Sequence, residues 1–443
     1  MKRQIAILLS AVLLCLVFAG CEAETASAKK LWVVTDLGWQ WSGGGDTELN
    51  EERADVDFRA ILNYFGGLPE DVEVELEVLP VNAKDLSARL TRLKTEILAG
   101  GGPDVFLLTC DMPNGGGWMA QERLFPNPEK AMYAGYFLPL DEYIENAQFM
   151  EWDKLTPVIM EAGRTEEGQM ILPFNYDTAG VVITKKEFLG EKVPENWDEA
   201  VDGENPVYQK GYAWLALNGF PNVFPKVVDN KTEELLITKE ELLHRVNQTL
   251  PCPDPRSEYP AEVTRFVPAA QGQDGHDLWG TDLDNTVFLP MRNTEGGYTA
   301  YVTYYGAVSR NTEFPQEAFT ILDMFLSKQV LKREIFGGTV GDLGRGRQIY
   351  LFSNTWHSPV HEELYLGQPN SVDTISVSER AFKNFDQLRK EITHVYFPSD
   401  IERTIGEMYA DCYYSYQEKG NSKDIEKLVS EAYDRIWMMS GES

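Results

Sequence analysis

The sequence predicts an α/β protein whose sheets are mainly parallel and flanked by helices, organised as two lobes. Two observations carry this prediction. Apolar runs suited to buried strands alternate with amphipathic helical stretches between residues 31 and 109, and this alternation is typical of a parallel sheet covered by helices. The chain also has 443 residues, more than one hydrophobic core usually serves, so two lobes are expected.

The first third of the chain contains three strand patterns separated by two helical ones. Residues 31–35 are a continuous apolar run, as expected for a strand buried on both faces. Residues 55–65 are helical in pattern and stop at a glycine pair, and residues 72–79 alternate apolar with acidic side chains. Residues 84–99 place their leucines on one helical face and end at a Gly-Gly-Gly-Pro stop. Residues 104–109 then predict a third strand.

The remaining elements are more widely spaced. Residues 171–174 and 181–184 have strand character, and we assign both to the second lobe. Residues 298–308 return to the aromatic and β-branched composition of a strand. Amphipathic helices are predicted at 315–331 and near the C-terminus, and shorter helices at 141–146, 153–163 and 238–247.

The N-terminus has the layout of a secretory signal peptide. Lys2 and Arg3 precede a short apolar core, and small residues lead to Cys21. The core is too short to span a membrane. The Ala-Gly-Cys ending resembles the lipobox of bacterial lipoproteins, which implies removal of residues 1–20, lipidation of Cys21 and a polar tether at 21–30. Two acyl chains would anchor the protein stably. The alternative is an ordinary cleaved signal with Cys21 unmodified.

The composition argues against several classes of function. The formal net charge of −30 repels phosphate backbones and anionic headgroups, so we expect no nucleic-acid partner and no membrane contact besides the lipid. Five histidines without zinc-ligand spacing argue against a metal site. Once Cys15 leaves with the signal and Cys21 is lipidated, Cys110, Cys252 and Cys412 remain. At most one disulfide can form among them, and we favour buried thiols.

Several motifs in register resemble the extracellular solute-binding proteins of ABC importers, of the carbohydrate type. The motifs are AGGGPDVF at 99–106, LPLDEYI at 138–144, GQMILPF at 168–174 followed by VVITKKEF at 181–188, PENWDEA at 194–200, and the returning strand and helix from Gly296 to Ser327. The resemblance covers most of the chain from Leu31 to about Phe336, and it rests on these five motifs in register with the lipobox.

The resemblance implies a two-lobe periplasmic-binding-protein-like fold with hinge strands between the lobes and a ligand in the cleft. We assign residues 31–117 and 298–337 to the first lobe, and residues 118–297 and 338–443 to the second. It further implies a monomeric, non-enzymatic protein without a cofactor, held at the extracytoplasmic face of the cell membrane. Its partners would be a carbohydrate ligand and the permease subunits of an ABC transporter, with lobe closure on ligand producing the form that the permease recognises.

Candidate ligand contacts are sought just after the predicted strands, because open α/β sheets place ligands at the carboxyl ends of their strands. A sugar needs aromatic platforms for its C–H face and polar side chains for its hydroxyls. The candidates are Asp36, Trp39 and Trp41 after the first strand, Asp111 and Trp118 after the third, Asn175 and Asp177 after the Leu-Pro strand, and Tyr298 at the returning strand. The resemblance to solute-binding proteins implies Trp279 as a further candidate ligand contact.

Each candidate has a structural alternative. The loop tryptophans can be lids over a core, and Asp36 and Asp111 can be helix caps or loop stabilisers. Two other functions are also weighed against the carbohydrate-binding lipoprotein. One is an extracellular glycosidase using two carboxylates, although no acidic pair stands in a context that demands a raised pKa. The other is a signalling module that binds a peptide or a polyamine, because the acidic charge leaves cationic ligands open.

Overall fold

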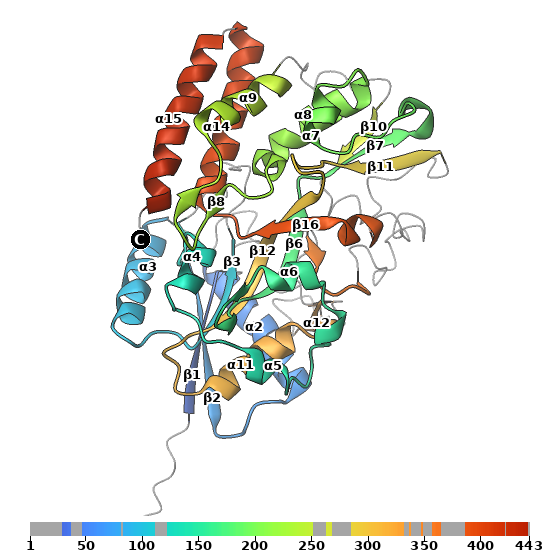
Figure 1. Ribbon diagram of the computed structural model, residues 1–443. Helices are drawn as coiled ribbons and strands as arrows, with labels where there is room; N and C mark the ends of the chain where they lie inside the picture. The colour runs from blue at the N-terminus through green and yellow to red at the C-terminus, as the bar shows by residue number, and fades with distance from the viewer. Residues whose placement is uncertain are drawn as a thin grey trace, which may run out of the picture.

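A seven-stranded sheet and a three-stranded sheet organise the chain (Figure 1). The computed structural model describes residues 29–36, 47–80, 83–110, 122–250, 263–267, 285–331, 336–337, 347–348, 357–364, 386–420 and 422–441. We call the larger sheet with its covering helices the first body, and the smaller sheet with the helices around it the second body.

The first body starts from β1 (Lys29–Thr35), which pairs in parallel with β2 (Val72–Val78) on one side and β3 (Val105–Thr109) on the other. The apolar strand β3 is buried along its whole length, whereas β2, at the end of the sheet, alternates valine or leucine with glutamate and has one buried residue. The connecting helices α2 (Thr47–Phe65) and α3 (Ala83–Leu98) pack into separate cores. The two helices therefore cover opposite faces of the sheet.

The strand β12 (Tyr298–Val308) lies in the middle of the larger sheet and runs antiparallel to both of its long neighbours, β3 and β6 (Leu172–Thr178). Its first residues also pair with β16 (Ile392–Tyr396), and β15 (Ser358–Pro359) pairs with the outer side of β6. The resulting order is β15-β6-β12-β3-β1-β2, with β16 beside β12. All eleven residues of β12 are buried.

Short helices complete the first body. These are α4 (Pro128–Tyr133), α5 (Asp141–Ile144), η2 (Trp152–Lys154), α6 (Pro157–Glu161), α11 (Pro315–Phe325) and α12 (Lys328–Leu331). The helix predicted at 315–331 is thus two helices, because Ser327 interrupts it and its Oγ accepts a hydrogen bond from the Val330 N–H at 3.4 Å. Serine is a preferred residue at such helix starts.

The second body has β7 (Val181–Lys185) between β10 (Val263–Val267) and β11 (Thr286–Pro290). Around this sheet lie η3 (Lys186–Phe188), α7 (Trp197–Val201), α8 (Pro206–Gly219), η4 (Phe220–Val223), α9 (Lys239–Thr249), α14 (Asp400–Lys419) and α15 (Ser422–Gly441). Its core is aromatic: Trp197 is fully buried, and the Phe220 and Tyr409 rings stack at 4.1 Å.

Two-residue strands form the pairs β4 (Arg164–Thr165) with β5 (Gly168–Gln169), β8 (Val228–Asp229) with β9 (Glu234–Leu235), and β13 (Phe336–Gly337) with β14 (Arg347–Gln348).

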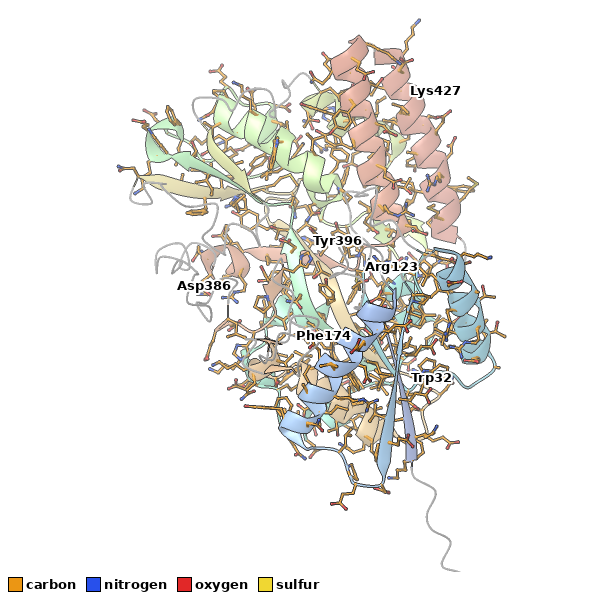
Figure 2. All side chains as sticks on the ribbon, turned by 180° about the vertical axis from the view of Figure 1, so that it is seen from behind. Trp32, Arg123, Phe174, Asp386, Tyr396 and Lys427 are labelled. Atoms are coloured by element: carbon orange, nitrogen blue, oxygen red, sulfur yellow. The ribbon has the colours of Figure 1, made fainter. Side chains whose placement is uncertain are left out.

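Three described connections join the two bodies: β6 to β7, β11 to β12, and β16 to α14. Figure 2 shows Tyr396, at the end of β16, between the two bodies. The Tyr396 hydroxyl donates to Asn222 Oδ1 at 2.9 Å, and Asn222 Nδ2 donates to the Thr299 carbonyl at 2.7 Å. The start of β12 is therefore attached to η4 of the second body.

Two features differ from the sequence-based description. The sheets are not mainly parallel, since β12 opposes its long neighbours and the three-stranded sheet is antiparallel in its described pairings. The sequence places residues 171–174 in the second lobe, but β6 pairs with β12 in the larger sheet, and Leu172, Phe174 and Tyr176 join the first body's core. In the larger sheet both differences involve β12, which comes from the second body, runs antiparallel to β3 and β6 and pairs with β6.

Candidate functional site

The predicted ligand contacts that the structure describes gather at one edge of the larger sheet. The strands β1, β3 and β6 run in the same direction, because β12 is antiparallel to both β3 and β6. Asp36 follows β1, Cys110 follows β3, and Asn175 and Asp177 lie in the last half of β6. Trp39, Trp41, Asp111, Trp118, Trp279 and Cys21 lie outside the described residues.

Asp36 is held in a buried network with the end of β3. Its Oδ1 accepts from the Thr109 N–H at 2.9 Å, and its Oδ2 accepts from Thr109 Oγ1 at 2.7 Å and from Arg123 Nη1 at 3.1 Å. Burial raises the pKa of the Asp36 carboxyl, while Arg123 and Thr109 act in the opposite direction. The cavity beside it has a volume of about 10 Å³, room for no more than one water. These contacts favour the alternative in which Asp36 stabilises the loop.

Asn175 and Asp177 are both almost fully buried. Asp177 Oδ2 lies 3.3 Å from His357 Nδ1, and Asp177 Oδ1 accepts from the Thr178 N–H at 2.8 Å. The ring of His357 is 5.7 Å from that of Tyr304 on β12. His357 is not among the predicted contacts, because a single histidine 180 positions from its partner carries no local signal in the sequence.

Tyr298 lies at the junction of the two bodies, where β12 begins. The guanidinium of Arg292 lies 4.8 Å from the centre of its ring, within the range of a cation–π contact. Arg292 Nη2 also donates a hydrogen bond at 3.2 Å to Oε2 of Glu391, the residue that precedes β16. Burial raises the pKa of the Tyr298 hydroxyl. Tyr298 is therefore part of the connection between β11, β12 and β16.

Two more tyrosines, neither of them predicted, extend this junction. Tyr301 is paired in register with Asp177, and its ring centre lies 6.1 Å from that of Tyr396. Burial raises the pKa of both hydroxyls well above the ordinary value. The described part of the edge thus combines buried aromatic rings with carboxylate, amide and imidazole groups.

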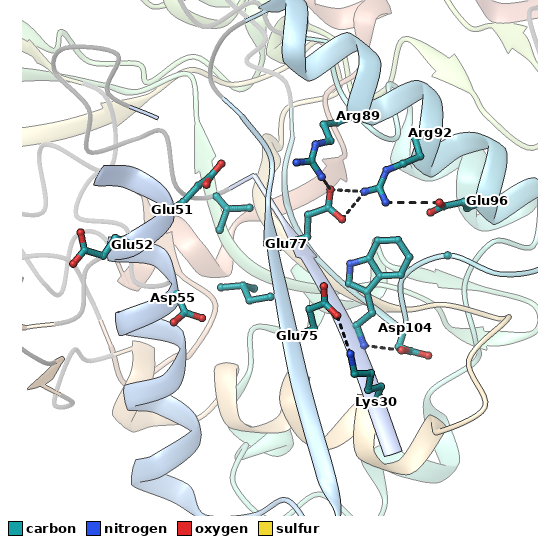
Figure 3. A pocket seen from close by; sticks show the side chains of 14 residues that line it. Lys30, Glu51, Glu52, Asp55, Glu75, Glu77, Arg89, Arg92, Glu96 and Asp104 are labelled. Carbon is teal, nitrogen blue, oxygen red and sulfur yellow. Dashed lines mark hydrogen bonds and ion pairs between the residues drawn. The ribbon is translucent and has the colours of Figure 1, made fainter. Parts of the chain in front are cut away.

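Larger cavities lie away from this edge. A groove of about 880 Å³ runs around the outer strand β2, between α2 and α3 (Figure 3). Its charges are largely paired: Glu77 accepts from Arg89 at 2.9 Å and from Arg92 at 2.5 Å, and Lys30 lies 3.8 Å from Glu75. A second groove of about 660 Å³ lies between α3 and α4 and the ends of α14 and α15. Of the predicted ligand contacts that the structure describes, none lines either groove.

Three further properties concern the described residues alone. In these ranges we find no group of three His, Cys, Asp or Glu side chains placed to hold a metal ion. None of the helices they form is both long and apolar enough to cross a membrane. Cys110 and Cys412 are buried, and burial raises the pKa of the Cys412 thiol to about 12. Cys252 lies outside the described residues.

No protein-family profile matches the sequence, and no curated protein matches it. Solved structures match it over nearly the whole chain. An extracellular solute-binding protein of family 1 from Alicyclobacillus acidocaldarius superposes with a TM-score of 0.55 at 12% identity, covering 95% of this chain and 100% of that one.

Two other structures have similar scores. A de novo designed cysteine esterase has a TM-score of 0.53 at 11% identity, covering 94% of this chain and 98% of its own. A periplasmic oligogalacturonide binding protein from Yersinia enterocolitica has a TM-score of 0.50 at 13% identity, covering 93% and 99%. At such identities the likeness is one of fold. The chain has the α/β fold of extracellular solute-binding proteins, as the sequence predicted.

Proposed function

We propose that this protein is an extracytoplasmic solute-binding protein that captures a carbohydrate between its two bodies and delivers it to an ABC permease. The observation that carries the proposal is the junction itself. Two separately cored bodies are joined by three described connections, and buried polar and aromatic side chains gather there. Two bodies linked by a few strands can close around a ligand by a hinge motion.

The choice of carbohydrate rests on the chemistry of the junction and on the structural neighbours. Sugars bind where aromatic rings adjoin hydrogen-bonding side chains, and Tyr301, Tyr304 and Asp177 provide both. One protein of the same fold is an oligogalacturonide binding protein. We propose that Trp39, Trp41, Asp111, Trp118 and Trp279 complete the ligand site beside the described edge.

The rest of the proposal concerns anchoring and lobe division. Lipidated Cys21 would hold the mature protein at the membrane through two acyl chains. The lobes would correspond to the two bodies, and residues 122–178 would then belong to the first lobe, because their apolar side chains pack in its cores.

We propose that the protein releases its ligand unchanged. The designed esterase shows that this fold is compatible with an enzyme, so the fold does not decide the matter. Asp36 and Asp177 are the carboxylates described at the edge, and they are engaged with Arg123 and His357. A glycosidase needs an acid kept protonated beside a second free carboxylate. Prolonged incubation of the pure protein with a bound oligosaccharide should therefore yield no shorter products.

The direct test is a thermal-shift and calorimetric screen of the full chain in mild detergent. The panel contains maltotriose, mannotriose and trigalacturonic acid, with spermidine and a basic tripeptide as the alternative ligand classes. A saccharide at 100 times its Kd should add about 2.7 kcal/mol to the free energy of unfolding. Small-angle scattering should show a smaller radius of gyration with that saccharide. Binding of spermidine or the peptide, with no response to any saccharide, would refute the proposal.

A further inference from the structure

The pairing between β6 and β12 is irregular at one place. Val302 pairs with Tyr176 and Tyr304 pairs with Asn175, so Thr303 is an extra residue on β12. The next step skips Phe174 on β6, which restores the register. The Thr303 carbonyl accepts from the Cys110 N–H at 2.9 Å, so the irregularity lies at the carboxyl end of β3. Bulges of this kind frequently redirect a side chain beside a functional site.

Two buried polar atoms at this bulge have no hydrogen-bond partner among the residues that the structure describes. They are Asn175 Oδ1 and Thr303 Oγ1. Both residues are almost fully buried, at 2% and 3% exposure. An unpaired buried polar atom is costly, and nearly all such atoms in folded proteins find a partner. Asn175 is paired with Tyr304, the residue that follows Thr303, so the two unpaired atoms belong to the same irregular stretch of the sheet.

Another threonine on the same strand provides the comparison. Thr299 is buried to the same degree as Thr303. Its hydroxyl donates to the Phe224 carbonyl at 3.0 Å and accepts from Asn293 Nδ2 at 3.0 Å. The packing of β12 is thus able to satisfy a threonine hydroxyl completely, and at Thr303 it does not.

We propose that Thr303 Oγ1 and Asn175 Oδ1 bind hydroxyl groups of the ligand and form the floor of its site. The proposal rests on the proposed function. An amide oxygen only accepts hydrogen bonds, whereas a threonine hydroxyl both donates and accepts. A polyhydroxylated ligand supplies neighbouring hydroxyls that fill both roles. A polyamine offers N–H donors and would leave the donor capacity of Thr303 unused.

The test is isosteric replacement of the hydroxyl, with Thr299 as the matched control. Thr303→Val removes an unpaired buried hydroxyl, so the urea midpoint of the free protein should stay the same or rise. Its affinity for the saccharide that the wild type binds best in the panel should fall about tenfold, the scale of one hydrogen bond. Thr299→Val should lower the urea midpoint and leave that affinity within about twofold.

Two further variants test whether the hydroxyl of Thr303 itself and the side chain of Asn175 contribute to binding. Thr303→Ser keeps the hydroxyl and should retain wild-type affinity, and Asn175→Leu should weaken binding like Thr303→Val. If the wild type binds a saccharide and Thr303→Val and Asn175→Leu bind it equally well, the floor proposal is wrong while the proposed function stands. If the wild type binds no saccharide, the proposed function itself fails. A Thr303→Val protein that loses stability as Thr299→Val does would also overturn the proposal, because its hydroxyl would then have a partner in the free protein.

Discussion

At the scale of single residues, the predicted ligand contacts differ in whether their buried polar atoms already have hydrogen-bond partners. Asp36 has each carboxylate oxygen hydrogen bonded to Thr109 or Arg123, whereas the side-chain oxygen of Asn175 has no hydrogen-bond partner within the described part of the chain. A side chain whose groups are all engaged has little left to offer a ligand, so the hydrogen-bond inventory is more informative than position in a loop.

We predict that Asp36→Asn acts on stability. Asp36→Asn removes the carboxylate charge of a buried ion pair with Arg123, which should cost about 3–5 kcal/mol of unfolding free energy. Saccharide affinity should change less than about threefold. Asp55→Asn, which breaks the exposed Asp55–Arg59 pair, should cost less than about 1 kcal/mol. Urea titrations and calorimetry measure both quantities, and a large affinity loss with normal stability would assign Asp36 to the ligand instead.

The loop tryptophans are the sharpest prediction from sequence. If Trp39, Trp41 or Trp118 stacks on the ligand, its replacement by alanine should weaken binding by about 1–3 kcal/mol. Stability should fall much less, because a residue facing an open cleft is partly solvated. If the tryptophan instead covers a core, its replacement by alanine should lower the free energy of unfolding by about 3–5 kcal/mol. Tryptophan fluorescence should change on saturation, and stability losses without affinity losses in all three variants would contradict the platform role.

At the scale of elements, helix ends and short loops join the two bodies. α14 begins with a capping box, in which Glu402 Oε2 accepts from the Ser399 N–H at 2.9 Å and from Ser399 Oγ at 2.6 Å. Nearby, Glu129 of α4 accepts from Lys226 Nζ at 2.5 Å and from Asn230 Nδ2 at 2.9 Å. α4 belongs to the first body, and the segment 226–230 packs in the second.

Glu402 should make folding stability depend on pH. Burial raises its pKa to about 7 against the hydrogen bonds from Ser399. Between pH ~4.5 and ~7 the native state keeps a proton that the unfolded chain releases, so stability falls as pH rises through this window. Across this pH window the wild type should lose about 3 kcal/mol of unfolding free energy relative to Glu402→Gln. Urea titrations at several pH values measure the difference, and Glu407→Gln further along α14 should behave like the wild type.

The contacts of Glu129 should contribute to the attachment of the two bodies. Glu129→Gln leaves Lys226, one third of whose side chain is exposed, without its counter-charge, and we expect a loss of about 1–3 kcal/mol of unfolding free energy. Glu233→Gln breaks the more exposed pair with Lys130 and should cost less than about 1 kcal/mol. Equal, negligible losses in both variants would show that the Glu129 contacts add nothing to stability.

At the scale of the whole molecule, two bodies with separate hydrophobic cores and three described connections suit movement of one body against the other. The start of β12 is bonded to η4 of the second body, and its later residues pair with β3 of the first. The bulge at Thr303 lies between these two attachments. A ligand bound at this place would contact the segment that connects the bodies, and its preference for one arrangement would shift the population toward that arrangement.

Anchoring also belongs to this scale. We predict that Cys21→Ser abolishes lipid attachment and releases the protein from membranes, because the strongly negative chain offers little attraction to anionic lipids. The folded body should be unchanged, with the same thermal transition and the same saccharide affinity as the wild type. Fractionation after a high-salt wash measures the release. Retention of the variant in the membrane fraction would contradict anchoring through Cys21.

The sequence by itself determined the α/β class and the elements of the first 110 residues. The helices α2 and α3 and the strands β1, β2 and β3 follow from local periodicity and stop signals, which need no distant partner. The start of α2 is an exception, because the helix begins at Thr47 and not at the predicted residue 55. The same applies to β12, whose predicted bounds of 298–308 agree with the structure.

Only the tertiary structure decided how these elements combine and which polar groups meet. The direction of β12 depends on its return from the second body, which no local pattern encodes. Arg123 meets Asp36 across 87 positions and His357 meets Asp177 across 180, while the bulge at Thr303 exists only in relation to β6. Such contacts follow from the packing of distant segments, and a local pattern of side chains carries no information on which of them will be neighbours.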